Sequence, residues 1–571
     1  MAHLHYRFSW QRANRQTIDI TFTIQNNQEE SLLIQLPSWR PGRYELGNFA
    51  KNLRTFTIEN TAGEAIPFQK ITKDSWQVDA GKHQTLLVHY SYYAADLNAG
   101  ATWLDEEQLY VNPVNCCLYL PQRRNEPCTV ELMIPADYQI ACDLPRGKQA
   151  NVLEADSFDR LADAPFVASA KLLHHQFEES GHLFHLWFMG RVNPPWEKLE
   201  NDFRPFCKAQ IEVMGPLPGR EFHFIFQILP VFYYHGVEHT YSTVCALGPD
   251  HLVFTGTHYD NLLGVSSHEL FHAWNVKTMR PVEMHPYDYT RENYSRLGWI
   301  YEGITTYYGD QFLIRSGSFN EKQYFDTLHE KLQRHFASYG RLNQAVTDAS
   351  FDTWLDGYVP GIPHRKTSIY TEGSLIALIL DMKIREHSQD RLSLDQFIRN
   401  LLDKHAAYTK ADIIEELHDL GVADAAEFYA NFIEKPGNLE PLLHWAFARV
   451  GMKMENHQHL SVVEHRFGFQ LVESGNSLNF GLIAPNSPAE KAGLRMGDTL
   501  VAVEGIKATK NLSAQIGDKT QVTFHVFSAE KLKEITLQSG SEKFFESRHL
   551  TIDPQAPSSA VAARKSWIVN L

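Results

Sequence analysis

The sequence predicts a multidomain α+β protein, and three observations support this fold class. Its 571 residues exceed what one hydrophobic core usually organises, which is about 250–300 residues. Short runs that alternate apolar and polar residues fill the first 175 or so positions, as expected for strands. The later part of 176–455 shows apolar residues at helical spacing instead, so we expect separate β-rich and helical regions.

The segment 1–175 is predicted to form an N-terminal antiparallel β-sandwich. Runs such as 17–24, 31–36 and 129–134 alternate in polarity and are rich in Ile, Val and Thr, which favours half-buried strands. The stretch 36–44, Leu-Pro-Ser-Trp-Arg-Pro-Gly-Arg-Tyr, indicates a rigid loop after a strand. We expect this domain to shape a cleft and to carry no chemistry.

The segment 176–455 is predicted to be an α+β domain that ends in a helical lobe. Ser318 and Glu321 have capping-box spacing, which predicts a helix from there through His335. Ser393 and Gln396 have the same spacing and predict a further helix.

Composition and charge exclude several classes of function. The net charge is −15 without a dense Lys/Arg run, so nucleic acid and anionic membranes are not expected partners. No stretch approaches the ~18 apolar residues of a membrane span, and the first residues lack an apolar signal segment. Six cysteines form no disulfide framework or zinc-ribbon spacing, which predicts reduced thiols and a cytoplasmic location.

The most informative motif is His-Glu-x-x-His at 268–272. On a helix, His268 and His272 project from the same face and can bind one Zn²⁺, while Glu269 can act on a water molecule there. The apolar neighbours Leu270 and Phe271 place such a helix against a core. The alternative is a surface helix with two ordinary histidines.

Glu302 is the predicted third metal ligand. It interrupts an apolar helical pattern at 297–308, and a buried lone carboxylate is unfavourable unless a cation compensates it. Two histidines and a carboxylate favour zinc, with a fourth position left for water. The alternative is that Glu302 pairs with a buried arginine.

The combination of this motif with the downstream Trp-x-x-Glu-Gly at 299–303 resembles the gluzincin metallopeptidases. Twenty-nine residues separate His272 from Glu302, and the phrase His-Ala-Trp-Asn-Val-Lys-Thr-Met-Arg-Pro spans 272–281. Both features resemble the glycyl aminopeptidase family, as does Trp-x-Pro-Gly-x-Tyr at 39–44. The resemblance implies a thermolysin-like catalytic domain and a preference for small N-terminal residues, Gly or Ala.

The resemblance also implies a tyrosine that stabilises the oxyanion. Tyr370 and Gly373 match the tyrosine and glycine of the family's Tyr-x-Lys-Gly, whereas Glu372 replaces its lysine and reverses a charge. The alternative for Tyr370 is a core tyrosine at the start of a buried helix.

Tyr234–Ser242 resembles the Gly-Leu-Glu-His element of the same family. The resemblance implies that Gly236, Glu238 and His239 contact substrate, with Glu238 binding the free α-amino group. Such a carboxylate selects chain ends, because an internal peptide bond brings no charge to pair with it. The alternative is an ordinary edge strand with one surface carboxylate.

The segment 456–545 contains Ser-Pro-Ala-x-x-Ala-Gly-Leu-x-x-Gly-Asp at 487–498 and resembles a bacterial PDZ domain. Phe467, Gly468 and Phe469 then fall at the loop that captures a chain end. The domain either binds a protein C-terminus or packs on its own chain. The tail 546–571 is rich in Ala, Ser and Pro, and we expect it to be loosely ordered except at its apolar end, 567–569.

Taken together, the sequence predicts a zinc-dependent aminopeptidase that acts on peptides with a free N-terminus. Its residues are Glu269 and Tyr370 for catalysis, Glu238 for the substrate amine, and His268, His272 and Glu302 for one zinc ion. A PDZ-directed zinc endopeptidase is the first alternative. A non-catalytic PDZ binding protein is the second.

Overall fold

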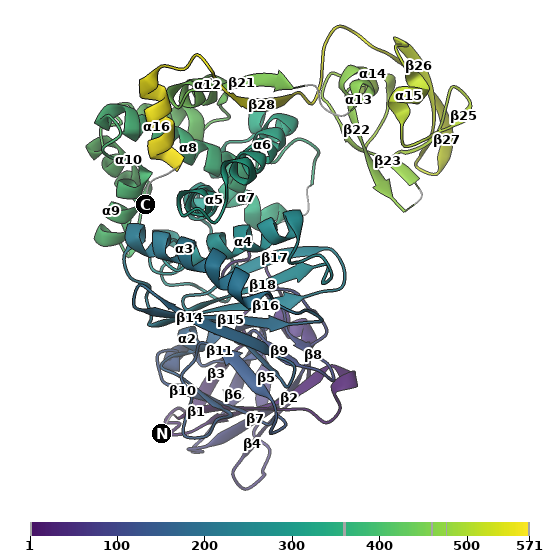
Figure 1. Cartoon of the computed structure of the whole chain (residues 1–571). Coiled ribbons are helices and arrows are strands. Elements are labelled where there is room, and N and C mark those ends of the chain that lie inside the picture. Colours follow the sequence, from purple (N-terminus) through teal and green to yellow (C-terminus); the bar gives the residue numbers. More distant parts are fainter. Residues whose placement is uncertain (1–2, 358–360, 458–460, 476, 569–571) are drawn as a thin grey trace.

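A computed structural model of the chain describes residues 3–357, 361–457, 461–475 and 477–568. The N-terminal region lies at one end of the molecule, the helices lie above it, and the predicted PDZ domain projects to one side (Figure 1). Among the described residues, no helix combines the length and apolarity needed to cross a lipid bilayer.

The N-terminal region is β-rich, as predicted. Its main sheet has the order β12-β10-β1-β2-β7-β4, beside a four-stranded sheet β11-β13-β9-β8 and a three-stranded sheet β3-β6-β5. Phe8 and Phe166 meet edge to face at 5.8 Å, which joins the two larger sheets through their apolar faces. One pair departs from the antiparallel pattern, because β1 and β10 run parallel. The strands of the main sheet are β1 (Leu4–Ser9), β2 (Thr17–Ile24), β4 (Leu53–Asn60), β7 (Leu86–Tyr93), β10 (Cys128–Leu132) and β12 (Val152–Ala155).

The strands of the two smaller sheets are β3 (Ser31–Gln35), β5 (Phe68–Lys70), β6 (Ser75–Asp79), β8 (Trp103–Leu104), β9 (Leu109–Val111), β11 (Gln139–Cys142) and β13 (Phe166–Ser169). The short helix α2 (Phe158–Ala162) lies between β12 and β13.

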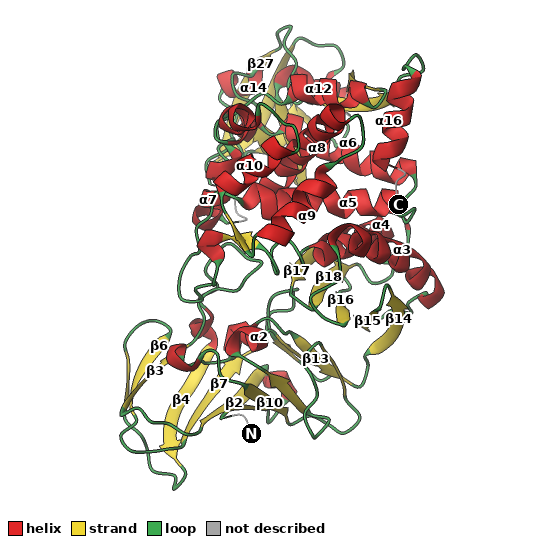
Figure 2. Ribbon diagram, turned by 90° about the vertical axis from the view of Figure 1, so that its left-hand side faces the viewer, coloured by secondary structure: helices red, strands yellow, loops and turns green. Residues whose placement is uncertain are grey.

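A five-stranded mixed sheet forms the centre of the molecule, in the order β14-β15-β16-β18-β17. Side chains alternate along β16, so that Phe224 packs toward the helices and Ile225 packs toward the N-terminal sheets. Figure 2 shows this sheet between the N-terminal sheets and the helices α3 and α4. The strands are β14 (Leu173–Glu179), β15 (His182–Met189), β16 (Glu221–Ile228), β17 (Tyr233–Glu238) and β18 (Ser242–Gly248); the helices are α3 (Trp196–Met214) and α4 (Gly256–Phe271).

The helical lobe is present, but its first cap differs from the prediction. Asn320, two residues beyond the predicted Ser318, caps α6 and forms a reciprocal box with Gln323. Ser318 instead donates to the carbonyl of Asp202 (2.8 Å), because the buried Phe319 draws the chain inward. The longer helices of the lobe are α5 (Thr305–Arg315), α6 (Glu321–Ala337), α7 (Val346–Asp356), α8 (Ile369–Ser388), α9 (Leu394–Lys404), α10 (Lys410–Asp419) and α12 (Glu440–Arg449).

The predicted PDZ domain is inserted between two paired strands of the helical lobe. β21 (Met452–His457) runs antiparallel to β28 (Ser547–Ile552), and everything between them forms a separate unit with its own core. Its elements are α13 (Val462–Phe467), β22 (Phe469–Ser474), β23 (Ser477–Ile483), α14 (Pro488–Ala492), β24 (Thr499–Val503), β25 (Ile506–Lys507), α15 (Leu512–Ile516), β26 (Gln521–Ser528) and β27 (Lys531–Gln538).

The C-terminal segment is ordered, contrary to our expectation of a loose tail. After β28, the chain forms α16 (Ser558–Ile568), which packs on the helical lobe. Alanine is the strongest helix former, and the apolar residues anchor the helix: Trp567 is 1% exposed and donates to the hydroxyl of Tyr307 at 3.1 Å. The last expected apolar residue, Val569, lies outside the described residues.

We predict that Trp567→Ala lowers the free energy of unfolding of the helical lobe by about 3–5 kcal/mol, because it leaves a cavity and breaks a buried hydrogen bond. Urea unfolding followed by circular dichroism measures the change. Lys565→Ala, on the exposed side of the same helix, is the matched control. Equal midpoints for both variants would show that α16 adds nothing to the core.

Candidate metal centre

The two histidines of the motif meet at the C-terminal end of α4. His268 lies in the last turn and His272 directly follows the helix. Their Nε2 atoms are 3.1 Å apart. Nδ1 of His272 faces the carbonyl of Asn275 at 2.8 Å, and a carbonyl only accepts. Nδ1 therefore carries the proton, and Nε2 presents its lone pair to the site.

Glu302 completes the triad from a second element, η5 (Trp299–Ile304), a π-helical turn just before α5. One carboxylate oxygen of Glu302 lies 3.7 Å from His268 Nε2 and 3.6 Å from His272 Nε2. Burial alone raises the pKa of Glu302, but its interactions with His268 and His272 outweigh this effect and lower the pKa to about 2. The carboxylate is therefore charged, and the alternative of a buried arginine partner is not what the structure shows.

This donor set fits a divalent metal ion. Ligand atoms about 2.0–2.2 Å from a tetrahedral zinc ion lie about 3.3–3.6 Å from one another, and the three donor separations here span 3.1–3.7 Å. Beside them, Oε2 of Glu269 is buried without a hydrogen-bond partner. Burial raises the pKa of Glu269 well above its usual value, and the charges of Glu238 and Glu302 add to this effect.

Asn275 connects the two ligand-bearing elements, and our sequence analysis missed it. Besides orienting His272, its side-chain amide donates to the carbonyl of Ile300 and to the hydroxyl of Thr305, both at 3.1 Å. A π-turn displaces carbonyls from the regular helical pattern, and Asn275 satisfies one of them. The signal in the sequence was an asparagine between the apolar residues Trp274 and Val276, directly after the motif.

Tyr44 brings the N-terminal domain into the metal centre. Its buried hydroxyl donates to Oε1 of Glu302 at 2.7 Å, and its ring lies 5.4 Å from that of Tyr301. The loop after β3 therefore contacts the candidate metal ligand Glu302 directly, in addition to the expected role of the domain in shaping a cleft. The loop itself was recognised at 36–44, but nothing local in the sequence reveals its long-range partner.

Glu238 lies at the end of the edge strand β17 and faces Glu269. It is 4% exposed, and its Oε1 is buried without a hydrogen-bond partner. Ligand atoms of Glu238, Glu269 and His272 lie within 4.8 Å of one another. A Cβ on Gly42 would collide with the Glu238 carboxylate, and one on Gly236 would collide with that of Glu269. The alternative of a surface carboxylate is wrong, because the chain encloses Glu238.

His239 is held by a buried network that crosses the domain boundary. Its Nδ1 lies 3.1 Å from Asp163, which also accepts from the backbone of Thr240 (2.9 Å) and from Lys277 Nζ (2.6 Å). Burial opposes the charge of Asp163, but Lys277 and His239 lower the pKa of this carboxyl well below its usual range. This ion pair fixes the end of β17 against the segment that follows the metal ligand His272.

Tyr370 lies in the first turn of α8, as predicted, and close to the metal centre. Gly303 and Gly373 touch through their backbones, since a Cβ on either would collide with the other. Tyr370 also helps raise the pKa of Tyr44, after burial and the charge of Glu302. Glu372 faces elsewhere and bonds His335 at 2.7 Å, so this departure from the family pattern leaves the metal centre untouched.

A second group of two histidines and a carboxylate has different hydrogen bonding. His185 and His223 are paired on β15 and β16, and their Nε2 atoms lie 3.5 and 3.6 Å from Glu221. However, Trp187 donates its indole N–H to Nδ1 of His223 (3.2 Å). The neutral ring then carries its proton on Nε2, which faces Glu221 as a donor and offers no lone pair to a metal.

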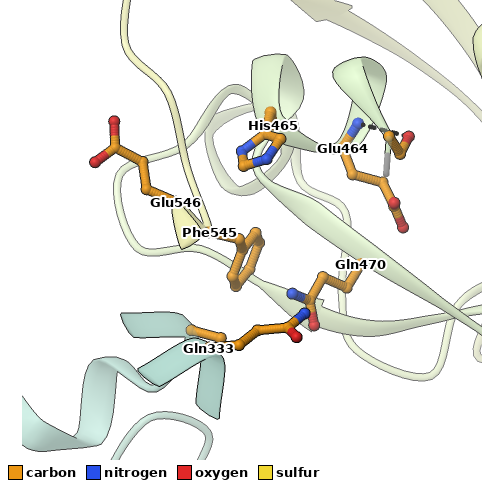
Figure 3. A pocket seen from close by; sticks show the side chains of 8 residues that line it. Gln333, Glu464, His465, Gln470, Phe545 and Glu546 are labelled. Carbon is orange, nitrogen blue, oxygen red and sulfur yellow. Dashed lines mark hydrogen bonds between the residues drawn. The ribbon is translucent and has the colours of Figure 1, made fainter. Parts of the chain in front are cut away.

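The predicted PDZ loop is largely covered by its own chain. Phe467 and Phe469 are fully buried, and Gly468 adopts a φ of 76° at the end of α13. Beside this loop, a cavity of about 30 Å³ separates α6 from the PDZ domain (Figure 3). Gln333 and Glu464 are among the residues that line it. None of the lining residues belongs to the metal centre.

Comparison with known proteins agrees with this architecture. The M61 peptidase N-terminal domain matches residues 5–170, the M61 glycyl aminopeptidase domain matches 261–376, and a PDZ domain matches 481–521. No curated protein sequence matches the chain. A solved aminopeptidase N family protein from Idiomarina loihiensis is 26% identical, with a TM-score of 0.90, and the match covers 99% of this chain and 100% of that one.

More distant solved structures include an M1 zinc metallopeptidase from Deinococcus radiodurans, at 11% identity and a TM-score of 0.49 over 76% of this chain and 94% of that one. Another is yeast LTA4 hydrolase in complex with bestatin, at 14% identity and a TM-score of 0.45 over 76% of this chain and 68% of that one.

The fold and the matched domains define a metallo-aminopeptidase. Within that class, the chain carries both M61 domains followed by a PDZ domain, so the predicted resemblance to the glycyl aminopeptidase family is confirmed.

We predict that Tyr44→Phe weakens zinc binding by about 10–100-fold, because the ligand Glu302 loses the hydrogen bond that orients it. Competition with a chromogenic chelator measures the affinity. Tyr90→Phe removes another buried hydroxyl of the same domain, which donates to the carbonyl of Cys116 at 2.8 Å, and serves as the control. Unchanged affinity in Tyr44→Phe would remove this role.

Proposed function

We propose that this protein is a zinc-dependent aminopeptidase that removes small N-terminal residues, Gly or Ala, from peptides with a free amino group. One observation carries the proposal: the buried and incompletely bonded carboxylate of Glu238 lies beside Glu269 and the metal triad. A positively charged group must compensate it when substrate fills the site. The matched domain is that of a glycyl aminopeptidase, which supports a small first residue; the inclusion of Ala rests on the family resemblance alone.

In this proposal, His268, His272 and Glu302 hold one zinc ion. When bound, zinc supplies Lewis-acid activation and lowers the pKa of water. Glu269 accepts a proton from the attacking water and later delivers it to the leaving amine. The hydroxyl of Tyr370 donates to the oxygen of the scissile carbonyl as negative charge develops there.

Electrostatics explain why a chain end is selected over a chain interior. Glu238, Glu269 and Glu302 are all buried. Lys277 interacts electrostatically with Glu238, but its ammonium group is bound to Asp163 at 2.6 Å. A substrate ammonium supplies one positive charge at the position of Glu238, whereas an internal peptide bond supplies none. An internal peptide thus leaves a buried carboxylate uncompensated, which argues against the endopeptidase alternative.

For the PDZ domain, we propose a docking role on its own chain. The carboxylate of Glu464 accepts from the backbone N–H of Leu471 at 2.8 Å, so a chain carboxylate already occupies an amide of the edge strand β22. In addition, His364, which precedes α8 in the helical lobe, bonds the carbonyl of Ile483 in β23 at 2.5 Å. Capture of a foreign C-terminus is the alternative.

The six cysteines are all free and buried, which supports the cytoplasm as the location.

We predict that Glu269→Gln lowers kcat for alanine p-nitroanilide by about 10²–10⁴-fold, because the proton acceptor is lost. Zinc content, measured by mass spectrometry of the metal, stays at one ion per chain. Chelation abolishes wild-type cleavage, and added zinc restores it. If wild-type protein loaded with one zinc ion cleaves neither glycine nor alanine anilides, the proposed function fails.

We predict that Glu238→Gln lowers kcat/KM for the free-amine substrate by about 100-fold or more, because a buried ion pair is lost on the enzyme side. N-acetylated substrate is cleaved poorly by both proteins. Glu221→Gln, a largely exposed carboxylate on β16, is the control and keeps wild-type activity. Equal loss on free and blocked substrates in Glu238→Gln would favour the endopeptidase alternative.

A further inference from the structure

Two exposed aromatic side chains continue the substrate-facing row of β17. Gly236 and Glu238 face Glu269 and α4, and side chains on a strand alternate between faces. Tyr234 therefore shares that face, and its partner Leu247 on β18 packs toward the helices. Phe232 directly precedes β17, and its ring lies 6.2 Å from that of His258 in α4, so it lies on the same side.

Both aromatic side chains are unusually exposed to solvent for their size. Phe232 is 71% exposed and Tyr234 is 52% exposed, next to Val231 at 59%. An exposed apolar cluster beside an active site commonly marks a binding surface. Burial raises the pKa of the Tyr234 phenol, and the charges of Asp310 in α5 and Glu269 in α4 raise it further, as expected for a hydroxyl on the side of β17 that faces these helices.

The geometry also sets the direction of a bound peptide. If its amine lies at Glu238 and its first peptide bond lies at Glu269 beside Gly236, the chain runs opposite to β17 and continues toward Tyr234. β17 is the last strand of its sheet, so its outer edge can pair with an extended chain. At about 3.3 Å per residue, the third to fifth residues of the peptide pass Tyr234 and Phe232.

We propose that Tyr234 and Phe232 form an apolar subsite for the third to fifth residues of the substrate. The preferred substrates are then peptides of five or more residues with a small first residue and apolar side chains at these downstream positions. This inference rests on the proposed aminopeptidase function, because Glu238 and Glu269 define where the peptide begins.

The test compares two peptides, Ala-Ala-Leu-Phe-Leu and Ala-Ala-Ser-Asn-Ser, by the rate at which free alanine is released. Wild-type protein is expected to show about tenfold higher kcat/KM for the apolar peptide. The double variant Phe232→Ser/Tyr234→Ser is expected to lose this preference, so that the ratio of the two kcat/KM values approaches one. Ile506→Ser, which removes an apolar side chain 67% exposed in the PDZ domain, is the control and keeps the preference.

A second readout is independent of turnover. In zinc-loaded Glu269→Gln, calorimetry is expected to show tighter binding of the apolar peptide, and the added Phe232→Ser/Tyr234→Ser change abolishes the difference. Equal kcat/KM for both peptides in the wild type, or a preference that survives the double variant, would overturn the subsite while leaving the aminopeptidase intact. Release of alanine from neither peptide would instead overturn the proposed function, and the subsite with it.

Discussion

Burial of three carboxylates in one small space is the constraint on which the active centre depends. Glu238, Glu269 and Glu302 are each almost inaccessible to water, and burying an ionised carboxylate is unfavourable unless it is paired. The surrounding chain supplies only part of the compensation, mainly from the histidines to Glu302. These unpaired buried charges are the reason for proposing that two cations from outside the chain, a metal ion and a substrate ammonium, complete the centre.

The N-terminal domain covers the active centre and also contributes direct contacts to it. Tyr44 donates to the metal-ligand carboxylate, while Gly42, with a φ of 82°, brings its backbone against Glu238 where no side chain fits. Asp163 binds Lys277 and the residues after Glu238 at once. Because these contacts reach both Glu302 and Glu238, the spacing between these two carboxylates depends on how the N-terminal domain docks.

The local parts of this centre could be predicted from sequence, and the long-range parts could not. His268, Glu269 and His272 lie within one helical turn, so their spacing alone brings them together. Tyr44 and Glu302 are 258 positions apart, and their contact depends on domain docking that no local pattern encodes. The sequence predicts an ordinary α-helix around Glu302, whereas the structure has a π-turn there. The apolar spacing of the two is indistinguishable over so few residues. The C-terminal segment forms a helix where a loose tail was expected, because alanine favours helices yet is also common in loose tails.

The PDZ domain is joined to the catalytic domain by its two chain connections and by additional side-chain contacts. Both connections lie in one antiparallel pair, β21 and β28, and a pair of adjacent strands alone leaves an inserted domain free to swing. Phe544 and Phe545 pack against Tyr339 after α6, and His364 bonds Ile483 in the PDZ sheet. His364 precedes α8, the helix that carries Tyr370, so the contact that restrains the PDZ domain is made by the segment that leads into the active centre.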